Sequence, residues 1–132
     1  MFADLRLARR IDGAEGSLSA DIADAVIRRG AVAGAFGRAF AGGVAVFTGV
    51  DSPVNKVIGA GFAGAPDPRD LAALEGEYFS LGGSVRAEVS TLADPAFARY
   101  LTAHGYVLNG FENVLARSPR ASRTPVPACR RA

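Results

Sequence analysis

Few side chains in this sequence are of the types that carry out chemistry, and they are far apart. The 132-residue chain has a single histidine, His104, and a single cysteine, Cys129. One histidine and one cysteine cannot build a zinc site of the usual Cys/His kind, so we expect no metal. His104 ends a predicted helix, where the helix dipole favours an imidazolium, and we assign it a capping role. We find no Ser-His-Asp order, P-loop or paired-carboxylate signature.

Glu88 is a carboxylate that could serve as a general base. It lies in Val85–Ser90, where apolar and polar residues alternate as in a half-buried strand. Arg86 lies on the same face, so an ion pair is the simpler interpretation. Two polar pairs, Asn55-Lys56 and Glu112-Asn113, could line a cleft. They could equally be the solvent-facing residues of strands, in which successive side chains point to opposite faces.

The element that opens the chain is a predicted helix that ends at Gly30. Its apolar residues recur three and four positions apart, which predicts one buried face made of Ile11, Ala14, Leu18, Ile22 and Val26. Gly13 and Gly16 lie within the same stretch. Because glycine in a helix costs about 1 kcal/mol relative to alanine, we expect the helix to be frayed or broken near its start.

Strands and helices then follow one another to give an α/β chain. Short β-type runs at 31–36, 38–41 and 44–48, with Gly42-Gly43 between two of them, predict a hairpin or meander. Asp-Pro pairs at 67–68 and 94–95 mark the starts of two helices, 68–81 and 94–104. Further strands are predicted at 56–62, 85–90 and 106–117. We therefore expect a mixed, twisted sheet with flanking helices, an α/β (α+β) fold.

Composition limits where the protein works and what it binds. No apolar run approaches the roughly 18 residues that span a bilayer, and Arg6 and Arg9 interrupt any signal-peptide core. We therefore expect a cytoplasmic protein without a membrane partner. All acidic residues precede residue 117, whereas the segment 118–132 is basic, contains prolines and lacks aromatic residues. This pattern predicts a folded domain over 1–117 and a disordered tail over 118–132, without nucleic-acid binding.

The second half of the chain is similar to a pattern of the GNAT acyltransferase superfamily. In that family a strand leads to a small polar residue and a helix of the form A-x-x-L-Y-x-x-x-G-F, followed by a final strand pair. Here the matching stretch is Val85–Ser90, Asp94-Pro95 and the run ARYLTAHGY at 98–106. With the preceding elements the resemblance covers nearly all of 1–117. The chain also resembles the degenerate N-terminal half of tandem-GNAT bacterial proteins.

The resemblance implies an acetyl-CoA loop of the form [RQ]-x-x-G-x-[GA] between a strand and the next helix. The corresponding candidates in this chain are Gly59, Gly61, Phe62, Ala63 and Gly64. Pro66 and Pro68, which follow them, lack N–H donors, and Asp67 and Asp70 put carboxylates where phosphates would lie. The phosphate site is therefore predicted to be lost, although the glycines could still admit a pantetheine arm.

The resemblance further implies a tyrosine general acid four residues before the glycine at 105. That position holds Leu101, and Tyr100 lies about 100° away around the helix. Tyr100 could act only after a register shift. Tyr100 and Glu88 are thus the candidate catalytic residues, without a defined mechanism.

Three functions remain open at this point. The first is a degenerate GNAT-like domain, non-catalytic alone, that packs against a second GNAT-like domain or a homodimer mate, or serves as a substrate-binding half. The second is an active acyl-CoA-dependent N-acetyltransferase with an atypical cofactor loop, and the third is a small-molecule-binding module. An exposed apolar patch on the sheet or first helix would favour the first. We also expect that the chain could be a truncated form of a longer tandem protein.

Overall fold

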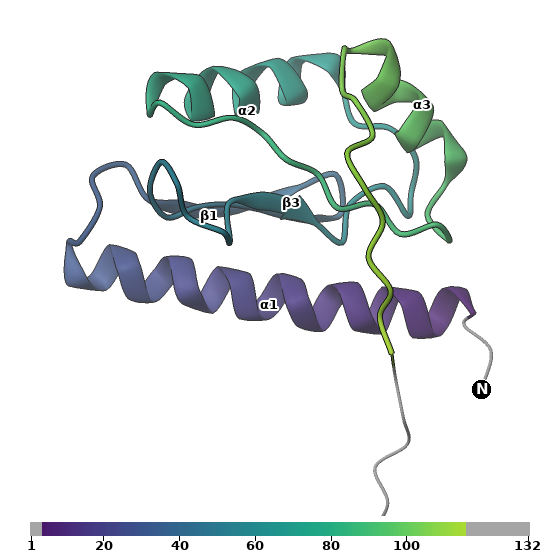
Figure 1. Cartoon of the computed structure of the whole chain (residues 1–132), viewed down its shortest axis with the longest axis horizontal. Helices are drawn as coiled ribbons and strands as arrows, with labels where there is room; N and C mark the ends of the chain where they lie inside the picture. The colour runs from purple at the N-terminus through teal and green to yellow at the C-terminus, as the bar shows by residue number, and fades with distance from the viewer. Residues whose placement is uncertain (1–3, 116–132) are drawn as a thin grey trace, which may run out of the picture.

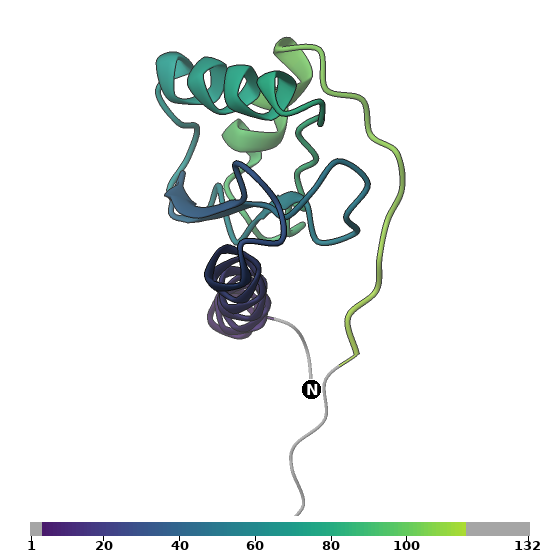
Figure 2. The same ribbon diagram turned by 90° about the vertical axis from the view of Figure 1, so that its left-hand side faces the viewer.

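Three antiparallel strands lie between one long helix and two shorter ones (Figures 1 and 2). The computed structural model describes residues 4–115, so the predicted tail at 118–132, including Cys129, lies outside the described residues. The fold is mixed α+β, as predicted, but the three strands form an antiparallel sheet rather than the mixed sheet that was expected. The elements are α1 (Leu5–Arg29), β1 (Phe36–Phe40), β2 (Gly43–Phe47), β3 (Lys56–Ile58), α2 (Pro68–Ser80) and α3 (Pro95–Ala103).

The sheet has the order β1-β2-β3, and its hairpin turn is shifted from the predicted place. Phe40 pairs with Gly43, so the turn residues are Ala41 and Gly42. Both have positive φ, 48° and 84°, as the tight turns that suit twisted hairpins require. The predicted strand at 31–36 is wrong except for Phe36, because the chain turns there instead.

Two predicted strands are shorter than expected. β3 ends at Ile58 rather than residue 62, because Gly59 and Gly61 adopt φ of 71° and 83°, which an extended strand does not use. The segment 85–90 contributes only a parallel bridge between Val57 and Ala87. That bridge is held by the N–H of Val57 donating to the carbonyl of Arg86 at 2.7 Å and that of Glu88 donating to Val57 at 2.9 Å.

The main core lies between the sheet and the layer of α2 and α3. Asp67 and Asp94 cap the two helices as predicted, each accepting a backbone N–H two residues on at 2.8 Å. Tyr78 from α2 is fully buried, and its hydroxyl donates to the carbonyl of Val46. Burial raises the pKa of Tyr78 to about 12. Phe36 and Phe47 pack edge-on against its ring.

The face of α1 that contacts the sheet is built from small residues, contrary to the prediction. Its buried residues are Ala8, Gly16, Ser19 and Ala23. A Cβ on Gly16 would lie 3.1 Å from Cγ1 of Val44, so glycine lets α1 approach the strands closely. The predicted apolar face points largely elsewhere, and Leu18 is exposed. The helix also runs unbroken through Gly13 and Gly16.

Alanine substitutions at the two glycines of α1 are expected to change the free energy of unfolding in opposite directions. A Cβ on Gly13 would meet nothing within 4 Å, so Gly13→Ala is expected to raise the free energy of unfolding by about 0.5–1 kcal/mol. Gly16→Ala gains the same helix propensity, but its Cβ must push Val44 aside. This substitution is therefore expected to lower the free energy of unfolding by about 1 kcal/mol. Urea denaturation followed by circular dichroism measures both changes. Equal shifts for the two variants would contradict the close packing of α1.

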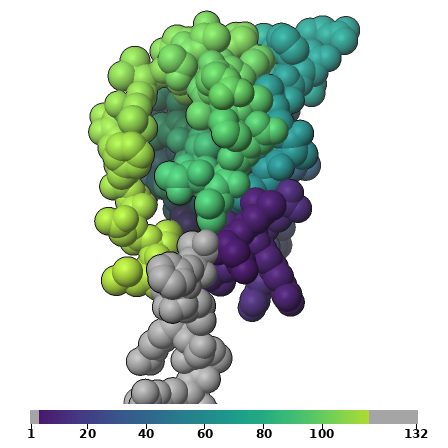
Figure 3. Space-filling model, turned by 90° about the vertical axis from the view of Figure 1, so that its right-hand side faces the viewer, coloured from purple at the N-terminus to yellow at the C-terminus, as the bar shows by residue number. Residues whose placement is uncertain are grey.

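The predicted last strand at 106–117 does not form within the described residues. Tyr106 still packs on the core, and its hydroxyl donates to Glu75 of α2 at 2.9 Å. Burial and that hydrogen bond raise the pKa of Tyr106. Residues 107–115, called the terminal segment below, have no regular secondary structure and run along one side of the molecule (Figures 2 and 3). Among residues 4–115 no helix meets the length and apolarity needed to cross a membrane.

Candidate functional site

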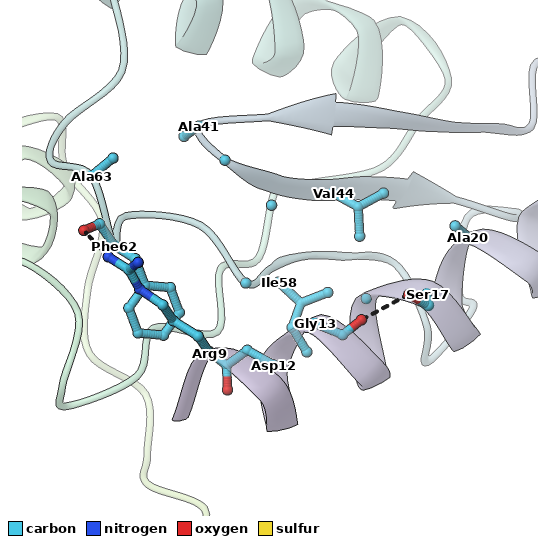
Figure 4. A pocket seen from close by; sticks show the side chains of 14 residues that line it. Arg9, Asp12, Gly13, Ser17, Ala20, Ala41, Val44, Ile58, Phe62 and Ala63 are labelled. Atoms are coloured by element: carbon cyan, nitrogen blue, oxygen red, sulfur yellow. Dashed lines mark hydrogen bonds between the residues drawn. The ribbon is translucent and has the colours of Figure 1, made fainter. Parts of the chain in front are cut away.

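A pocket of about 520 Å³ opens between α1 and the strands, and we call it the α1 pocket (Figure 4). One wall comes from α1, and the other comes from the β1–β2 turn, β2 and the end of β3. Glycines are frequent on both walls, and at two of them, Gly13 and Gly42, an added Cβ would meet nothing within 4 Å. The lining residues are Arg9, Asp12, Gly13, Gly16, Ser17, Ala20, Ala41, Gly42, Gly43, Val44, Ile58, Gly59, Phe62 and Ala63.

Arg9 is held at one end of the α1 pocket by Phe62. Its guanidinium carbon lies 5.5 Å from the centroid of the Phe62 ring, a cation–π distance. One guanidinium nitrogen also donates to the Phe62 carbonyl at 3.4 Å (Figure 4). These two contacts fix the charged group at the edge of the pocket.

Asp12 supplies a negative charge three residues further along α1. Burial, followed by repulsion from Glu15, raises the pKa of Asp12. The structure shows no ion pair to Asp12 within residues 4–115, whereas Glu15 is paired with Lys56. Asp12 is therefore a partly desolvated carboxyl group next to open space.

The predicted cofactor residues separate into two groups. Gly59, Phe62 and Ala63 line the α1 pocket, but Gly61 and Gly64 do not. A Cβ on Gly61 would lie 2.2 Å from Cδ1 of Phe97, so this glycine makes room for a core side chain of α3. The five residues thus divide between the α1 pocket and the loop beside α3, and in the described structure Phe97 packs against Gly61.

The N-terminus of α2, where the resemblance would put the phosphates, is acidic. Asp67 caps the helix, and its hydrogen bonds from Arg69 hold the pKa of its carboxyl below the usual value. Asp70 lies in the first turn. The carboxylates of Asp67 and Asp70 at this helix end oppose a diphosphate.

Glu88 is not free to act as a base, because it is one of two carboxylates that share Lys56. The Lys56 ammonium lies 2.7 Å from Oε1 of Glu88 and 2.6 Å from Oε1 of Glu15. The ion pair predicted with Arg86 is therefore wrong, because Glu88 pairs with Lys56 instead. The shared Lys56 ties the bridged segment 85–90 to β3 and α1.

Tyr100 faces the packing between α2 and α3. Its hydroxyl is buried with no hydrogen-bond partner in the described part of the chain. Burial raises the pKa of Tyr100, and the charges of Asp67, Glu75 and Asp70 act in the same direction. The ring packs on His104, whose Nδ1 lies 2.8 Å from the Tyr100 carbonyl at the end of α3.

The remaining polar pairs do not form a site either. Asn55 is buried, and its side chain accepts the N–H of Thr48 at 2.8 Å and donates to the carbonyl of Gly49, which fixes the loop before β3. Glu112 and Asn113 lie exposed in the terminal segment. Within residues 4–115 no three His, Cys, Asp or Glu side chains come together as a metal site would need.

Arg9 and Asp12 were not identified as site residues from the sequence: Arg9 was considered only as a charge that interrupts a signal-peptide core, and charged residues are expected on the exposed side of a helix. The glycines beside them were the available signal. Glycine where helix propensity opposes it marks either close packing, as at Gly16, or open space, as at Gly13. Only contacts with β2 and β3 show which of the two applies.

We compared the chain with protein-family models, curated proteins and solved structures. None of the three comparisons gave a match. The structure itself therefore supports a mixed α+β domain with a pocket between α1 and the sheet, and membership of a family remains a prediction.

Proposed function

We propose that this chain is a GNAT-like domain that is non-catalytic alone and works by packing against a second domain of its kind, here a second copy of itself. The order of elements supports this reading. A helix, three antiparallel strands, a second helix, a segment bridged in parallel to β3 and a third helix follow in the order that the resemblance implies.

The exposed terminal segment is the observation that carries the proposal. Its large apolar side chains are 62% to 95% exposed: Val107, Leu108, Phe111, Val114 and Leu115. Monomeric proteins rarely leave so many large apolar residues together in water. Extended backbone with unpaired N–H and C=O groups is also the form in which a chain adds a strand to a neighbouring sheet. Figure 3 shows the segment standing beside the body of the molecule.

The state of the catalytic candidates supports a non-catalytic role. Glu88 is bound to Lys56, and the Tyr100 hydroxyl is enclosed in packing. The acidic N-terminus of α2 disfavours the diphosphate of acetyl-CoA. A base, an acid and a cofactor site would all need to be created by rearrangement.

Sedimentation velocity over a range of protein concentrations tests the proposal. We expect the full chain to form a dimer and the double variant Leu108→Asp/Phe111→Asp to sediment as a monomer, because two buried charges would oppose the interface. Phe79→Asp is the matched control, since Phe79 is 62% exposed on α2 and lies outside the segment. A wild-type chain that stays monomeric throughout, or a control that dissociates as fully, would refute it.

Small-molecule binding is a second candidate that one observation favours. The α1 pocket includes three of the residues predicted to contact a ligand, Gly59, Phe62 and Ala63. It lies on the α1 side of the sheet, whereas α2 and α3 cover the other side (Figure 2). Its charged residues indicate a ligand chemistry different from that of acetyl-CoA.

A further inference from the structure

We propose that the α1 pocket binds a small zwitterion of the α-amino-acid class with an apolar side group. The site is separate from the proposed packing surface. Its lining comes from α1, the hairpin and the loop after β3, and includes no residue of the terminal segment. The two proposals can therefore fail independently.

The size and floor of the pocket suit an apolar group. Its volume of about 520 Å³ falls within the roughly 300–1,000 Å³ of small-molecule sites. Val44 and Ile58 present branched aliphatic side chains from the strands, and Ala20 and Ala41 line the space between α1 and the hairpin (Figure 4). Burying an aliphatic or aromatic group against them removes apolar surface from water.

Arg9 offers a prepared site for a carboxylate. The ring and carbonyl of Phe62 already hold its guanidinium. A guanidinium has five N–H donors, and among residues 4–115 only one of them takes part in a hydrogen bond, so two others can bind the two oxygens of a carboxylate. No ion pair to Arg9 occurs among the described residues. Because the contacts with Phe62 restrain this exposed side chain before binding, less conformational entropy is lost when a carboxylate binds.

Asp12 offers the complementary site for an ammonium group. Arg9 and Asp12 lie three positions apart on α1, where Cβ atoms are about 5–6 Å from each other, and both line the pocket, so one small molecule there would lie beside both side chains. The neighbouring Glu15 is occupied by Lys56, which leaves Asp12 as the carboxyl that a ligand cation meets. Its pKa is raised by burial, and a bound ammonium would favour the ionised form.

The pairing of one cation with one anion selects the class of ligand. A phosphate or other simple anion would be repelled by Asp12, and a simple amine would be repelled by Arg9. A zwitterion satisfies both at once and brings no net charge into the pocket. Discrimination should therefore depend on having both charged groups in the same molecule.

Ligand-detected NMR on the full chain, with L-leucine as the probe, tests the proposal. We expect leucine to bind, and both leucinamide, which lacks the carboxylate, and 4-methylpentanoate, which lacks the ammonium, to bind at least about tenfold more weakly. In Asp12→Asn the preference for leucine over 4-methylpentanoate should be lost. In Arg9→Gln the preference over leucinamide should be lost.

A blocking variant and its control locate the binding. Gly13 lines the pocket, and a Cβ there has nothing within 4 Å, so Gly13→Leu is expected to fill the pocket without unfolding α1. Gly76 in α2 has the same open surroundings, and Gly76→Leu should leave binding unchanged. Absence of leucine binding in the wild type, equal binding by the three probes, or leucine binding that survives Gly13→Leu would each overturn the proposal.

Discussion

Replacing Gly61 with alanine is expected to lower the free energy of unfolding by about 3–5 kcal/mol. The added Cβ would lie 2.2 Å from Cδ1 and 2.8 Å from Cβ of Phe97. Phe97 is fully buried and cannot move aside without disturbing the core. Gly61 also has a φ of 83°, which strains any residue with a side chain. Guanidinium denaturation of the full chain measures the change.

Gly64→Ala separates the effect of the clash from the effect of the backbone. Gly64 has a φ of 103°, but the nearest atom to an added Cβ is 3.9 Å away. We therefore expect a loss of about 1–2 kcal/mol from strain alone. Combining Gly61→Ala with Phe97→Ala should cost less than the sum of the two single losses, because alanine removes Cγ and Cδ1, the two Phe97 atoms nearest to the added Cβ. Similar losses at 61 and 64, or simple additivity, would contradict this role for Gly61.

Elements with strong local signals could be predicted from the sequence. The Asp-Pro pairs located the starts of α2 and α3, because an aspartate cap and a proline at the first helical position act within one turn. Leu71, Leu74 and Tyr78, the buried residues of α2, recur three and four positions apart, a pattern that is visible in the sequence itself. The hairpin was predicted because its strands are adjacent in the chain.

The buried face of α1 could not be predicted, because packing across the chain decides it. Side-chain size favoured the face with Leu18, yet the sheet accepts the face with Gly16 and Ala23, whose small side chains permit close approach. A Cβ on Gly37 of β1 would likewise lie 3.1 Å from Cβ of Ala23. Helix and strand thus fit by matching small residues, which a count of apolar positions does not detect.

The candidate site, too, could be predicted from the sequence only in part. The glycines after β3 were recognised as unusual, but whether each faces a ligand or a core residue depends on α1 and α3, which lie far away in the sequence. Gly59 lines the α1 pocket, whereas Gly61 makes room for Phe97. The pairing of Glu88 with Lys56 was missed for a related reason, since β3 and the segment 85–90 meet only through a parallel bridge.

Lys56→Met is expected to lower the free energy of unfolding by about 1–3 kcal/mol at neutral pH. Lys56 is largely buried, with 16% of its side chain exposed, and it neutralises Glu15 and Glu88, which are 39% exposed. Methionine fills similar space but leaves the two carboxylates facing each other. The variant Lys56→Met/Glu88→Gln should recover much of the loss, because it removes that repulsion. A loss that Glu88→Gln does not reduce would show that the ion pairs are not the cause.

The pH dependence of stability gives an independent test of the same cluster. Burial alone would lower the pKa of Lys56, but hydrogen bonds and attraction from Glu15 and Glu88 outweigh it and raise the pKa above the usual value. The folded state therefore holds this proton more tightly than the unfolded state. The stabilisation is complete below the unfolded pKa of about 10.4 and is lost as the pH rises through the folded value.

Tyr78 acts in the same direction as Lys56, because its pKa is raised to about 12 in the folded chain. The folded chain therefore also loses stability as the pH rises from the unfolded pKa of tyrosine to this folded value. Both the wild type and Lys56→Met should thus lose stability as the pH rises above about 10, but the variant should lose less, because only Tyr78 and the other tyrosines still contribute. Urea denaturation at a series of pH values from neutral to alkaline measures the two slopes. Equal slopes would mean that Lys56 holds its proton no more tightly in the folded chain than in the unfolded one, and that its contacts with Glu15 and Glu88 contribute no stability.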